Sequence, residues 1–346
     1  MIIIYLVFLC VFLIGIKFTK KDFNEEYLSK NTTTIINGLF VVTVFFSHFK
    51  NYIETTSILD TSLNKILGIV GQLMVATFLF YSGYGIMESI KNKKGYVKNF
   101  FKNRFVPTFL NFAIAICLFL IMDIAIGKNY SVSTIALSFI GWDNVGNSDW
   151  YMFATFVLYL FTIISFLNFD NTSQKKSLHN HIAILALLTI LYVIVIGQVK
   201  EARFVNTVLC YIAGVFYSCY RERIENVVQK SNWTYCITSI VVCICFIGIF
   251  LANKLFGNVL KINLIYNLYA ILFVFIVLLV SMKFKLNNKV FTFLGQHIFW
   301  IYILQRIPMI LLQGKLSNYF YFAISLAATI LMSIAMKNLM DKIWKR

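Results

Sequence analysis

The sequence predicts an all-α membrane protein that crosses the bilayer about eleven times and folds as a single helical bundle. Hydrophobic residues make up 60% of the 346 residues and charged residues 13%, whereas soluble domains are about 45–50% apolar and 25% charged. The mean hydropathy is +0.78. Apolar runs follow one another along the chain, and no Pro-, Gly- or Ser-rich linker divides them. These observations exclude a soluble globular protein.

The individual helices are predicted from apolar runs, because a hydrocarbon core about 30 Å thick requires about 20 apolar residues per helix. Such runs cover residues 2–16, 35–53, 66–88, 106–127, 150–168, 181–198, 204–220, 233–252, 263–282, 290–312 and 317–336. No small-residue cleavage site follows the first run, which predicts a retained anchor rather than a signal peptide. We therefore expect one membrane domain over 1–346, with an additional anchor helix and loop in 1–30 and the main bundle in 31–340.

Local residues mark the ends of several runs. The basic segment 91–104 separates the third run from the fourth, and Pro107 lies at the start of the fourth. Asp149 precedes the fifth run, where its side chain suits a helix N-cap. Pro308 is the other proline of the chain and lies within the predicted helix over 290–312.

Lysine and arginine are concentrated in alternate loops. If the N-terminus lies outside, 22 of the 31 Lys and Arg residues fall on the cytoplasmic side and eight on the outer side, and Arg306 lies within a run. Cytoplasmic loops of membrane proteins are enriched in Lys and Arg. We therefore expect a multi-pass plasma-membrane protein with its N-terminus outside and its C-terminus in the cytoplasm. The net charge of +17 then reflects membrane orientation and does not predict nucleic-acid binding.

The cysteines suggest no cross-linking or metal chemistry. All seven lie in or at the edges of apolar runs, without paired spacing in a loop. Neither a disulfide framework nor a metal site is predicted, and we expect no permanently bound cofactor.

His48, near the outer end of the second run, is the clearest candidate catalytic residue. Ionisable side chains within membrane helices are costly and therefore often functional. A neutral imidazole accepts a proton near neutral pH, which suits activation of a hydroxyl group for acyl transfer. The other interpretation is an interfacial histidine that is hydrogen-bonded to a neighbouring helix. Asn37 lies eleven residues earlier, about 16 Å nearer the cytoplasm in a helix that rises 1.5 Å per residue.

The segment that contains His48 resembles the acyltransferase 3 family of membrane O-acyltransferases, which modify surface glycans, lipids and other hydroxyl compounds. The family's hallmark is a basic residue, ten intervening residues and a catalytic histidine on one helix. His48 matches the histidine, whereas Asn37 occupies the position of the basic residue.

Other segments resemble the family in the expected order. Residues 71–85 (GQLMVATFLFYSGYG) are similar to its Gly-x-x-x-Val-x-x-Phe-Phe-x-x-Ser-Gly-Phe stretch, and residues 100–107 (FFKNRFVP) to its basic segment before a proline. Asp149-Trp150-Tyr151 with Tyr159 is similar to its Trp-Phe-x-x…Tyr pattern. Residues 294–308 (LGQHIFWIYILQRIP) are similar to its late Leu-Gly…Tyr-Leu-x-His-x-Pro element, with Gln305 in place of the histidine. The resemblance implies a catalytic role for His48, and the first helix lies outside it.

The polar residues divide into two layers if the topology is correct. On the cytoplasmic side, Lys102 and Arg104 belong to a basic segment over 98–104 that is either a binding site for the phosphates of acyl-CoA or an ordinary positive-inside loop. In the outer half lie the candidate acceptor-binding residues Asp149, Trp150, Arg203, Gln305 and Arg306.

The outer residues also have alternative interpretations. Asp149 and Trp150 form either a helix cap with an aromatic belt residue or the edge of a sugar site, where an indole stacks on a pyranose ring. Arg203 either binds the acceptor or forms a surface ion pair with Glu201. Arg306, within a membrane helix, needs a partner, and it is a candidate oxyanion donor or a clamp for a phosphorylated acceptor.

The predicted function is transfer of an acetyl group from cytoplasmic acetyl-CoA to a hydroxyl of a surface polysaccharide or of its lipid-linked precursor. His48 would either deprotonate the hydroxyl or carry the acyl group. The expected partners are acyl-CoA, the glycan acceptor and membrane lipid, without nucleic acid. Two alternatives are a transporter or glycan exporter without this chemistry and, because of Asn37 and Gln305, an inactive or substrate-modified family member.

Overall fold

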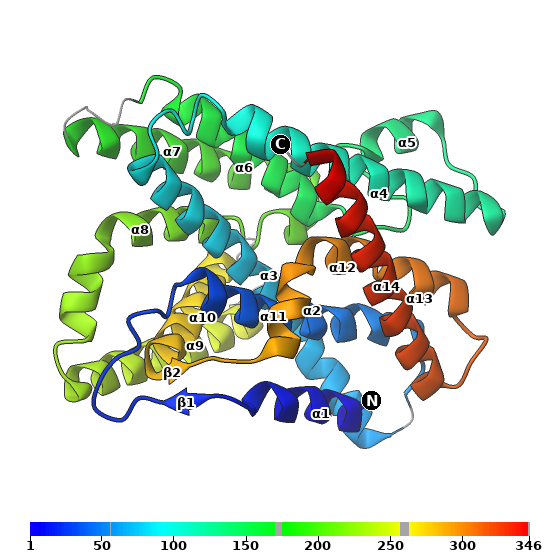
Figure 1. Cartoon of the computed structure of the whole chain (residues 1–346), viewed down its shortest axis with the longest axis horizontal. Helices are drawn as coiled ribbons and strands as arrows, with labels where there is room; N and C mark the ends of the chain where they lie inside the picture. The colour runs from blue at the N-terminus through cyan, green and yellow to red at the C-terminus, as the bar shows by residue number, and fades with distance from the viewer. Residues whose placement is uncertain (56, 170–174, 257–262, 345–346) are drawn as a thin grey trace.

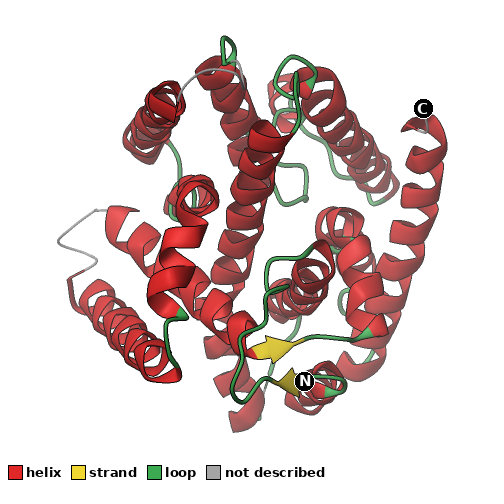
Figure 2. Cartoon of the chain, turned by 60° about the vertical axis from the view of Figure 1, so that its left-hand side comes forward, coloured by secondary structure: helices red, strands yellow, loops and turns green. Residues whose placement is uncertain are grey.

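The computed structural model describes residues 1–346 except 56, 170–174, 257–262 and 345–346 (Figure 1). The described chain is built almost entirely from helices, together with one pair of short antiparallel strands, β1 (Lys17–Phe18) and β2 (Phe284–Lys285). Figure 2 shows the strands as a small element among the helices. The predicted all-α membrane fold is therefore confirmed at this level.

Eight helical segments of the described chain are long and apolar enough to cross a membrane, and three further apolar helices are shorter. The eight are Lys30–Tyr52, Ile58–Asn92, Phe101–Ala125, Leu178–Val199, Ala202–Val228, Asn232–Ala252, Leu264–Lys283 and Asn318–Trp344. The shorter helices are Ile2–Leu13, Trp150–Phe166 and Ile298–Leu312. Each predicted run corresponds to one of these segments, and the total of eleven crossings stays a prediction.

The helices keep the order of the predicted runs, with one unpredicted short helix, α5. Their bounds are α1 (Ile2–Leu13), α2 (Lys30–Phe49), α3 (Ile58–Asn92), α4 (Val106–Ala125), α5 (Val132–Ser138), α6 (Trp150–Phe166), α7 (Lys175–Val199), α8 (Leu209–Val228), α9 (Asn232–Phe256), α10 (Asn263–Lys283), α11 (Lys289–Gln296), α12 (Ile298–Leu304), α13 (Arg306–Leu312) and α14 (Asn318–Trp344). In Figure 1, α1 lies along one edge of the molecule and α4, α6 and α7 along the opposite edge, with α2, α3 and α11 between them.

The prediction of one continuous helix over 290–312 was wrong. This segment is divided into α11, α12 and α13, with breaks at His297 and Gln305. Pro308 accounts for the second break, because a proline has no N–H to donate to the carbonyl four residues earlier, and its ring clashes with that carbonyl. The break places Gln305 and Arg306 at a helix junction.

Four glycines allow the helices that carry the candidate site to pack backbone to backbone. A Cβ atom on Gly83 of α3 would overlap the carbonyl oxygen of Tyr211 in α8, and one on Gly214 of α8 would overlap that of Phe80 in α3. Gly38 of α2 and Gly295 of α11 form a second reciprocal pair, against Phe291 and Thr34. Small residues permit such close approach between membrane helices.

The central helices are also the most buried. Most of the apolar window in α2, α3 and α8 is buried within the protein, whereas none of the window in α9 is. The start of α2 is defined by Ser29, whose side chain accepts a hydrogen bond from Thr32 N, as an N-cap residue does. A 3₁₀ turn, η1 (Lys50–Tyr52), follows its last residue. Asn37 and His48 therefore lie on a helix that is capped at its start and largely buried among other helices.

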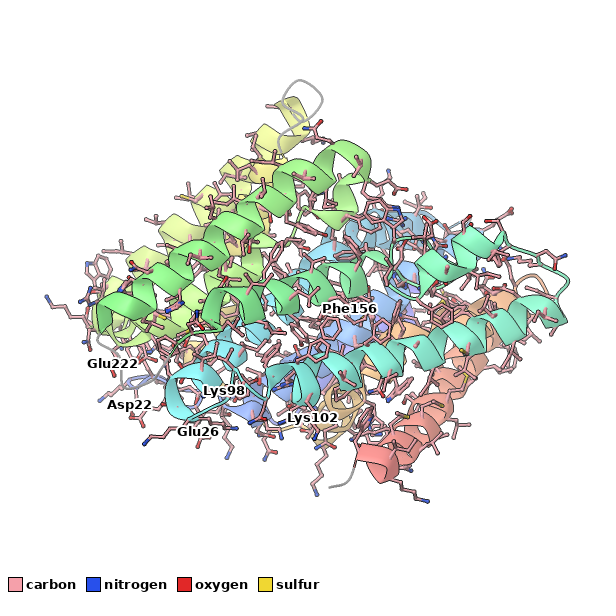
Figure 3. The ribbon with its side chains drawn as sticks, turned by 90° about the horizontal axis from the view of Figure 1, so that it is seen from above. Asp22, Glu26, Lys98, Lys102, Phe156 and Glu222 are labelled. Carbon is pink, nitrogen blue, oxygen red and sulfur yellow. The ribbon has the colours of Figure 1, made fainter. Side chains whose placement is uncertain are left out.

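Loops that the topology assigns to the same membrane side contact one another. On the side predicted to face the cytoplasm, here called the inner side, Asn24 donates to the carbonyls of Ser281 and Phe284, and Lys283 Nζ donates to Asp22 O. Figure 3 shows Asp22, Glu26, Lys98, Lys102 and Glu222 gathered at one side of the molecule.

The other loops meet at the opposite, outer side. Lys200 Nζ donates to Trp142 O, and Asn318 Nδ2 donates to Glu54 O. The alternation of loops between two sides agrees with the predicted topology. Which side faces the cytoplasm stays a prediction from charge.

Candidate active site

A cavity of about 420 Å³ lies between α2, α3, α6 and α12. Its wall is formed by Thr33, Asn37, Phe78, Tyr81, Ser82, Gly85, Ile86, Arg104, Thr108, Tyr151, Met152, Thr155, Tyr159, Ile298 and Phe299. We call it the central cavity. Because these residues come from distant parts of the chain, only the packing of the helices brings them together.

Two buried polar atoms of residues in this wall have no hydrogen-bond partner among the described residues, Asn37 Oδ1 and Tyr81 Oη. Buried polar groups are nearly always hydrogen-bonded, so unpaired ones call for an explanation. An amide oxygen accepts hydrogen bonds, whereas a phenol both donates and accepts them. Both atoms are fully buried, so they lie within the wall, and a ligand would reach them only after their side chains turn toward the cavity.

The basic end of the cavity is formed by Arg104, which lies on a single π-helical turn, η2 (Phe101–Phe105), just before Pro107. The phenol groups of Tyr159 and Tyr96 lie near the guanidinium of Arg104, and Tyr96 Oη has no described hydrogen-bond partner. Lys102 lies on the same turn as Arg104 and both side chains are exposed, but Lys102 does not line the central cavity. Of the two predicted donor-binding residues, the structure brings only Arg104 to the cavity.

Two aromatic rings lie between the central cavity and His48. Tyr151 lines the cavity, and its ring centroid lies 5.3 Å from that of Tyr302 in an edge-to-face arrangement. The Tyr302 ring lies 6.3 Å from the His48 ring. Tyr302 Oη is itself buried without a hydrogen-bond partner in the described structure. His48 is thus separated from the cavity by a contact between two phenol rings.

The side chain of His48 is partly exposed, and its Nδ1 atom is buried without a hydrogen bond to any described residue. The interpretation of His48 as an interfacial residue bonded to a neighbouring helix therefore finds no partner. The preceding Ser47 attaches this end of α2 to α3, because its Oγ donates to Leu67 O at 3.1 Å. The charged groups that act on His48 are Arg306 and Lys50.

Arg306 holds two outer segments together. Its Nε donates to Tyr52 Oη at 2.9 Å, and one terminal nitrogen donates to Asn147 O at 2.9 Å. Both partners are neutral, and no described carboxylate lies within 4.0 Å of its side-chain nitrogens. Gln305 beside it is fully buried and donates from Nε2 to Tyr302 O at 2.8 Å, while its Oε1 has no described partner. The two residues thus flank the Tyr302–His48 pair from the α12–α13 junction.

Asp149, Trp150 and Arg203 lie on the outer side at the start of α6. Asp149 is the N-cap of α6, and its Oδ1 accepts from Trp150 N at 2.8 Å. Arg203 pairs with Glu201 at 3.1 Å and lies 3.8 Å from Asp149 Oδ2. The structure thus contains the helix cap that was one interpretation of Asp149. It also contains the ion pair with Glu201 that was one interpretation of Arg203.

Trp150 is 9% exposed and its ring contacts that of Tyr151. Little of the indole is therefore available for stacking on a sugar, and its visible role is to support Tyr151.

The structure also adds residues that the sequence analysis did not select as site residues. Tyr81, Tyr151 and Tyr302 were part of the motif stretches but were not distinguished from the many aromatic residues of the membrane core. Asp123, at the outer end of α4, is 1% exposed and neither carboxylate oxygen has a described hydrogen-bond partner. The rule that charged residues within membrane helices are functional candidates would have selected it.

Comparison with known proteins gives one match. A family model described as an acyltransferase domain, that of the acyltransferase 3 family, matches residues 34–337. No curated protein and no solved structure matches the chain. The matched range includes all wall residues of the central cavity except Thr33, together with His48 and the α12–α13 junction, and leaves out α1 and β1.

Proposed function

The chain belongs to the acyltransferase 3 family, whose domain model matches residues 34–337, and from this premise we propose that it is a plasma-membrane O-acetyltransferase of surface glycans. The donor is acetyl-CoA from the cytoplasm. The acceptor is a hydroxyl group of a surface polysaccharide or of its lipid-linked precursor, presented at the outer side. No metal or tightly bound cofactor takes part in this proposal.

The observation that carries the proposal is the arrangement of the central cavity and His48. Asn37 and Tyr81, each with a buried unpaired polar atom, belong to the cavity wall, and so does Tyr151, whose ring contacts Tyr302 beside His48. The pantetheine arm of CoA is a chain with two amide groups, and its binding would supply hydrogen-bond partners for Asn37 and Tyr81 once their side chains turn toward it. The thioester at the end of this arm would then meet His48.

His48 supplies the proton transfer. In the general-base route, the imidazole takes the proton of the acceptor hydroxyl while its oxygen attacks the thioester carbonyl carbon. The new C–O bond forms, the C–S bond breaks, and the CoA sulfur leaves and takes the proton from the imidazolium. In the alternative route, His48 first accepts the acetyl group and then passes it to the hydroxyl. Both routes use the same ring and yield an ester and free CoA.

The remaining predicted residues divide between donor and acceptor. Arg104, with Lys102 on the same turn, supplies positive charge for the donor at the inner side. Arg306 and Gln305 border His48 on the acceptor side, and Arg306 is the candidate donor to the oxyanion that forms on the attacked carbonyl. Asp149, Trp150 and Arg203 form the outer wall beside Tyr151.

The function is tested with radiolabelled acetyl-CoA and membranes that contain the protein, followed by NMR of the purified glycan. We expect label to appear as O-acetyl ester on the glycan. Loss of the protein should remove the ester while the polymer still reaches the surface. If deletion instead stops export and leaves the acetylation of the retained polymer unchanged, the protein is a transporter and the acyltransferase proposal is wrong.

Replacement of Arg104 by glutamine tests the donor end of the cavity. A charge-assisted hydrogen bond contributes about 1.5–3 kcal/mol, so we expect the KM for acetyl-CoA to rise by about 10–100-fold. The kcat should change little, because Arg104 makes no described contact with His48. Steady-state release of CoA measures both constants. A fall in kcat at unchanged KM would contradict the assignment of Arg104 to donor binding.

Replacement of Asn37 by alanine tests whether its unpaired amide oxygen binds the donor or only contributes to folding. Loss of one neutral hydrogen bond to the donor should lower kcat/KM for acetyl-CoA by about 3–10-fold, which corresponds to about 0.5–1.5 kcal/mol. Folded stability should stay the same or increase, because a buried acceptor without a partner is removed. Thermal unfolding of the purified variant provides that second measurement. Lower stability with unchanged kinetics would show that Asn37 is only structural.

A further inference from the structure

A second cavity of about 540 Å³ lies at the inner side, between the segment after α3 and the end of α6. Lys93, Lys94, Tyr96, Lys98, Asn168 and Phe169 belong to its wall. We call it the lysine cavity. Its volume falls in the range of about 300–1,000 Å³ that small-molecule sites occupy.

Positive charge in this cavity is not balanced by the described part of the protein. None of Lys93, Lys94 and Lys98 has a described carboxylate within 4.0 Å, whereas the nearby Lys91 pairs with Glu88 at 2.6 Å. All three side chains are exposed. Three ammonium groups around one hollow form a site for a ligand with more than one negative charge, since ammonium groups bind phosphates through charge-assisted hydrogen bonds.

Two aromatic side chains provide the second feature of the wall. The Phe169 ring is held by Phe166, at 5.7 Å between ring centroids, and by His181 at 5.4 Å. The Tyr96 ring packs edge-to-face on Phe100 at 5.7 Å. Aromatic side chains provide surfaces for flat rings, so the wall combines phosphate-binding charges with contacts for a planar base. This combination distinguishes it from an ordinary positive-inside loop.

The lysine cavity is adjacent to the central cavity. Tyr96, in the wall of the first, packs on Phe100 at 5.7 Å between ring centroids. Phe100, which packs on Tyr96, also contacts Tyr159 of the central cavity at 5.3 Å between ring centroids. The two cavities are thus separated by one layer of aromatic side chains, and a ligand with a polyanionic head and a long neutral arm would have to displace part of this layer to occupy both.

We propose that the lysine cavity binds a nucleotide that carries several phosphate groups. On the basis of the acyltransferase function proposed above, this nucleotide is the phosphorylated adenosine end of the CoA donor. Its phosphates contact Lys93, Lys94 and Lys98, its base packs on Tyr96 or Phe169, and its pantetheine arm continues past Arg104 into the central cavity. Lys98 lies at the inner rim in Figure 3, where a cytoplasmic ligand has access if the predicted orientation holds.

The test measures nucleotide binding in the absence of acetyl transfer. Adenosine 3′,5′-bisphosphate, which lacks both thioester and pantetheine, is titrated by calorimetry into the purified protein in nanodiscs of neutral phosphatidylcholine. The variant K93Q/K94Q/K98Q is compared with K20Q/K21Q/K30Q, which removes the same number of charges from the same side. Thermal unfolding confirms that both variants are folded, and the three single substitutions provide a second series if the triple variant is not.

We expect the cavity variant to bind the bisphosphate about 100-fold more weakly than the unmodified protein, and the control variant to bind it within about threefold. Adenosine alone and inorganic phosphate alone should each bind more weakly than the bisphosphate. Equal binding by the cavity variant, or an equal loss in the control, overturns the site. If inorganic phosphate alone, or phosphatidylglycerol added to the nanodiscs, competes as strongly as the bisphosphate, the cavity is a general anion or lipid site and the proposal is also wrong.

The outcome is separable from the proposed chemistry. His48→Ala should bind the bisphosphate with unchanged affinity, because His48 does not line this cavity. If the lysines bind the nucleotide but acetyl-CoA is never consumed, the nucleotide site stands and the acyltransferase proposal fails. If acetyl-CoA is consumed while the cavity variant keeps full affinity and an unchanged KM, the enzyme stands and the lysine cavity is not its donor site.

Discussion

Replacement of His48 by alanine is expected to reduce acetyl transfer by about 10²–10⁴-fold, the range attributed to a positioned general acid or base. The folded protein should be unaffected, because His48 makes no hydrogen bond to a described residue and its Nδ1 is unpaired. The measurement is O-acetyl ester on the glycan together with release of CoA. Transport of the polymer to the surface should continue.

The matched control is His179→Ala, which removes an exposed histidine on the predicted cytoplasmic side that lines neither cavity. It should leave transfer unchanged. Unaltered O-acetylation in the His48 variant would rule out both catalytic routes. The two routes are distinguished in the unmodified protein, since an acetyl-histidine intermediate predicts exchange of label between acetyl-CoA and free CoA without acceptor.

Replacement of Gly83 by valine should produce the largest structural effect. The new Cβ would overlap the carbonyl oxygen of Tyr211, so the α3 and α8 backbones must separate. Overpacking within a well-packed core typically costs about 1–3 kcal/mol, and more when backbone has to move. We expect a destabilisation of about 3 kcal/mol or more, visible as a fall of several degrees in the thermal unfolding of the detergent-purified protein, together with loss of acyl transfer.

Gly248→Val on α9 is the appropriate comparison, because no atom lies within 4 Å of the Cβ that it would add. Both substitutions introduce the same β-branched residue into a helix, so differences in helix propensity largely cancel. Gly214→Val, the reciprocal position on α8, should resemble Gly83→Val. Equal stability of the Gly83 and Gly248 variants would show that α3 and α8 do not depend on this contact.

Much of the fold could be predicted from sequence because its main determinant is local. Twenty apolar residues between charged loops form a membrane helix whatever their neighbours are, and each predicted run has a helical counterpart. The segment over 290–312 was the exception. Pro308 gave a cue to the break at Gln305, whereas the break at His297 has no comparable local cause in the sequence.

The candidate site was less predictable, because it depends on packing between distant segments. His48 stood out as an ionisable residue in an apolar run, but its separation from the cavity by Tyr151 and Tyr302 depends on how α2, α6 and α12 pack. Lys102 and Arg104 are both basic residues of one short segment, so the sequence does not distinguish them, yet only Arg104 lines the central cavity. Trp150, at the start of a helix, suggested a surface for stacking on a sugar ring. Its burial depends on the packing of the helices and could not be predicted from sequence.

The contact between Tyr151 and Tyr302 bears on the energy supply of the cell as well as on catalysis. A passage that admits the pantetheine arm from one side and an acceptor from the other would, if open between turnovers, also admit protons and small ions and dissipate the membrane potential. In the structure these two rings meet edge to face, and Tyr151 lines the central cavity. We therefore expect the contact between these two rings to limit leakage through the protein between turnovers.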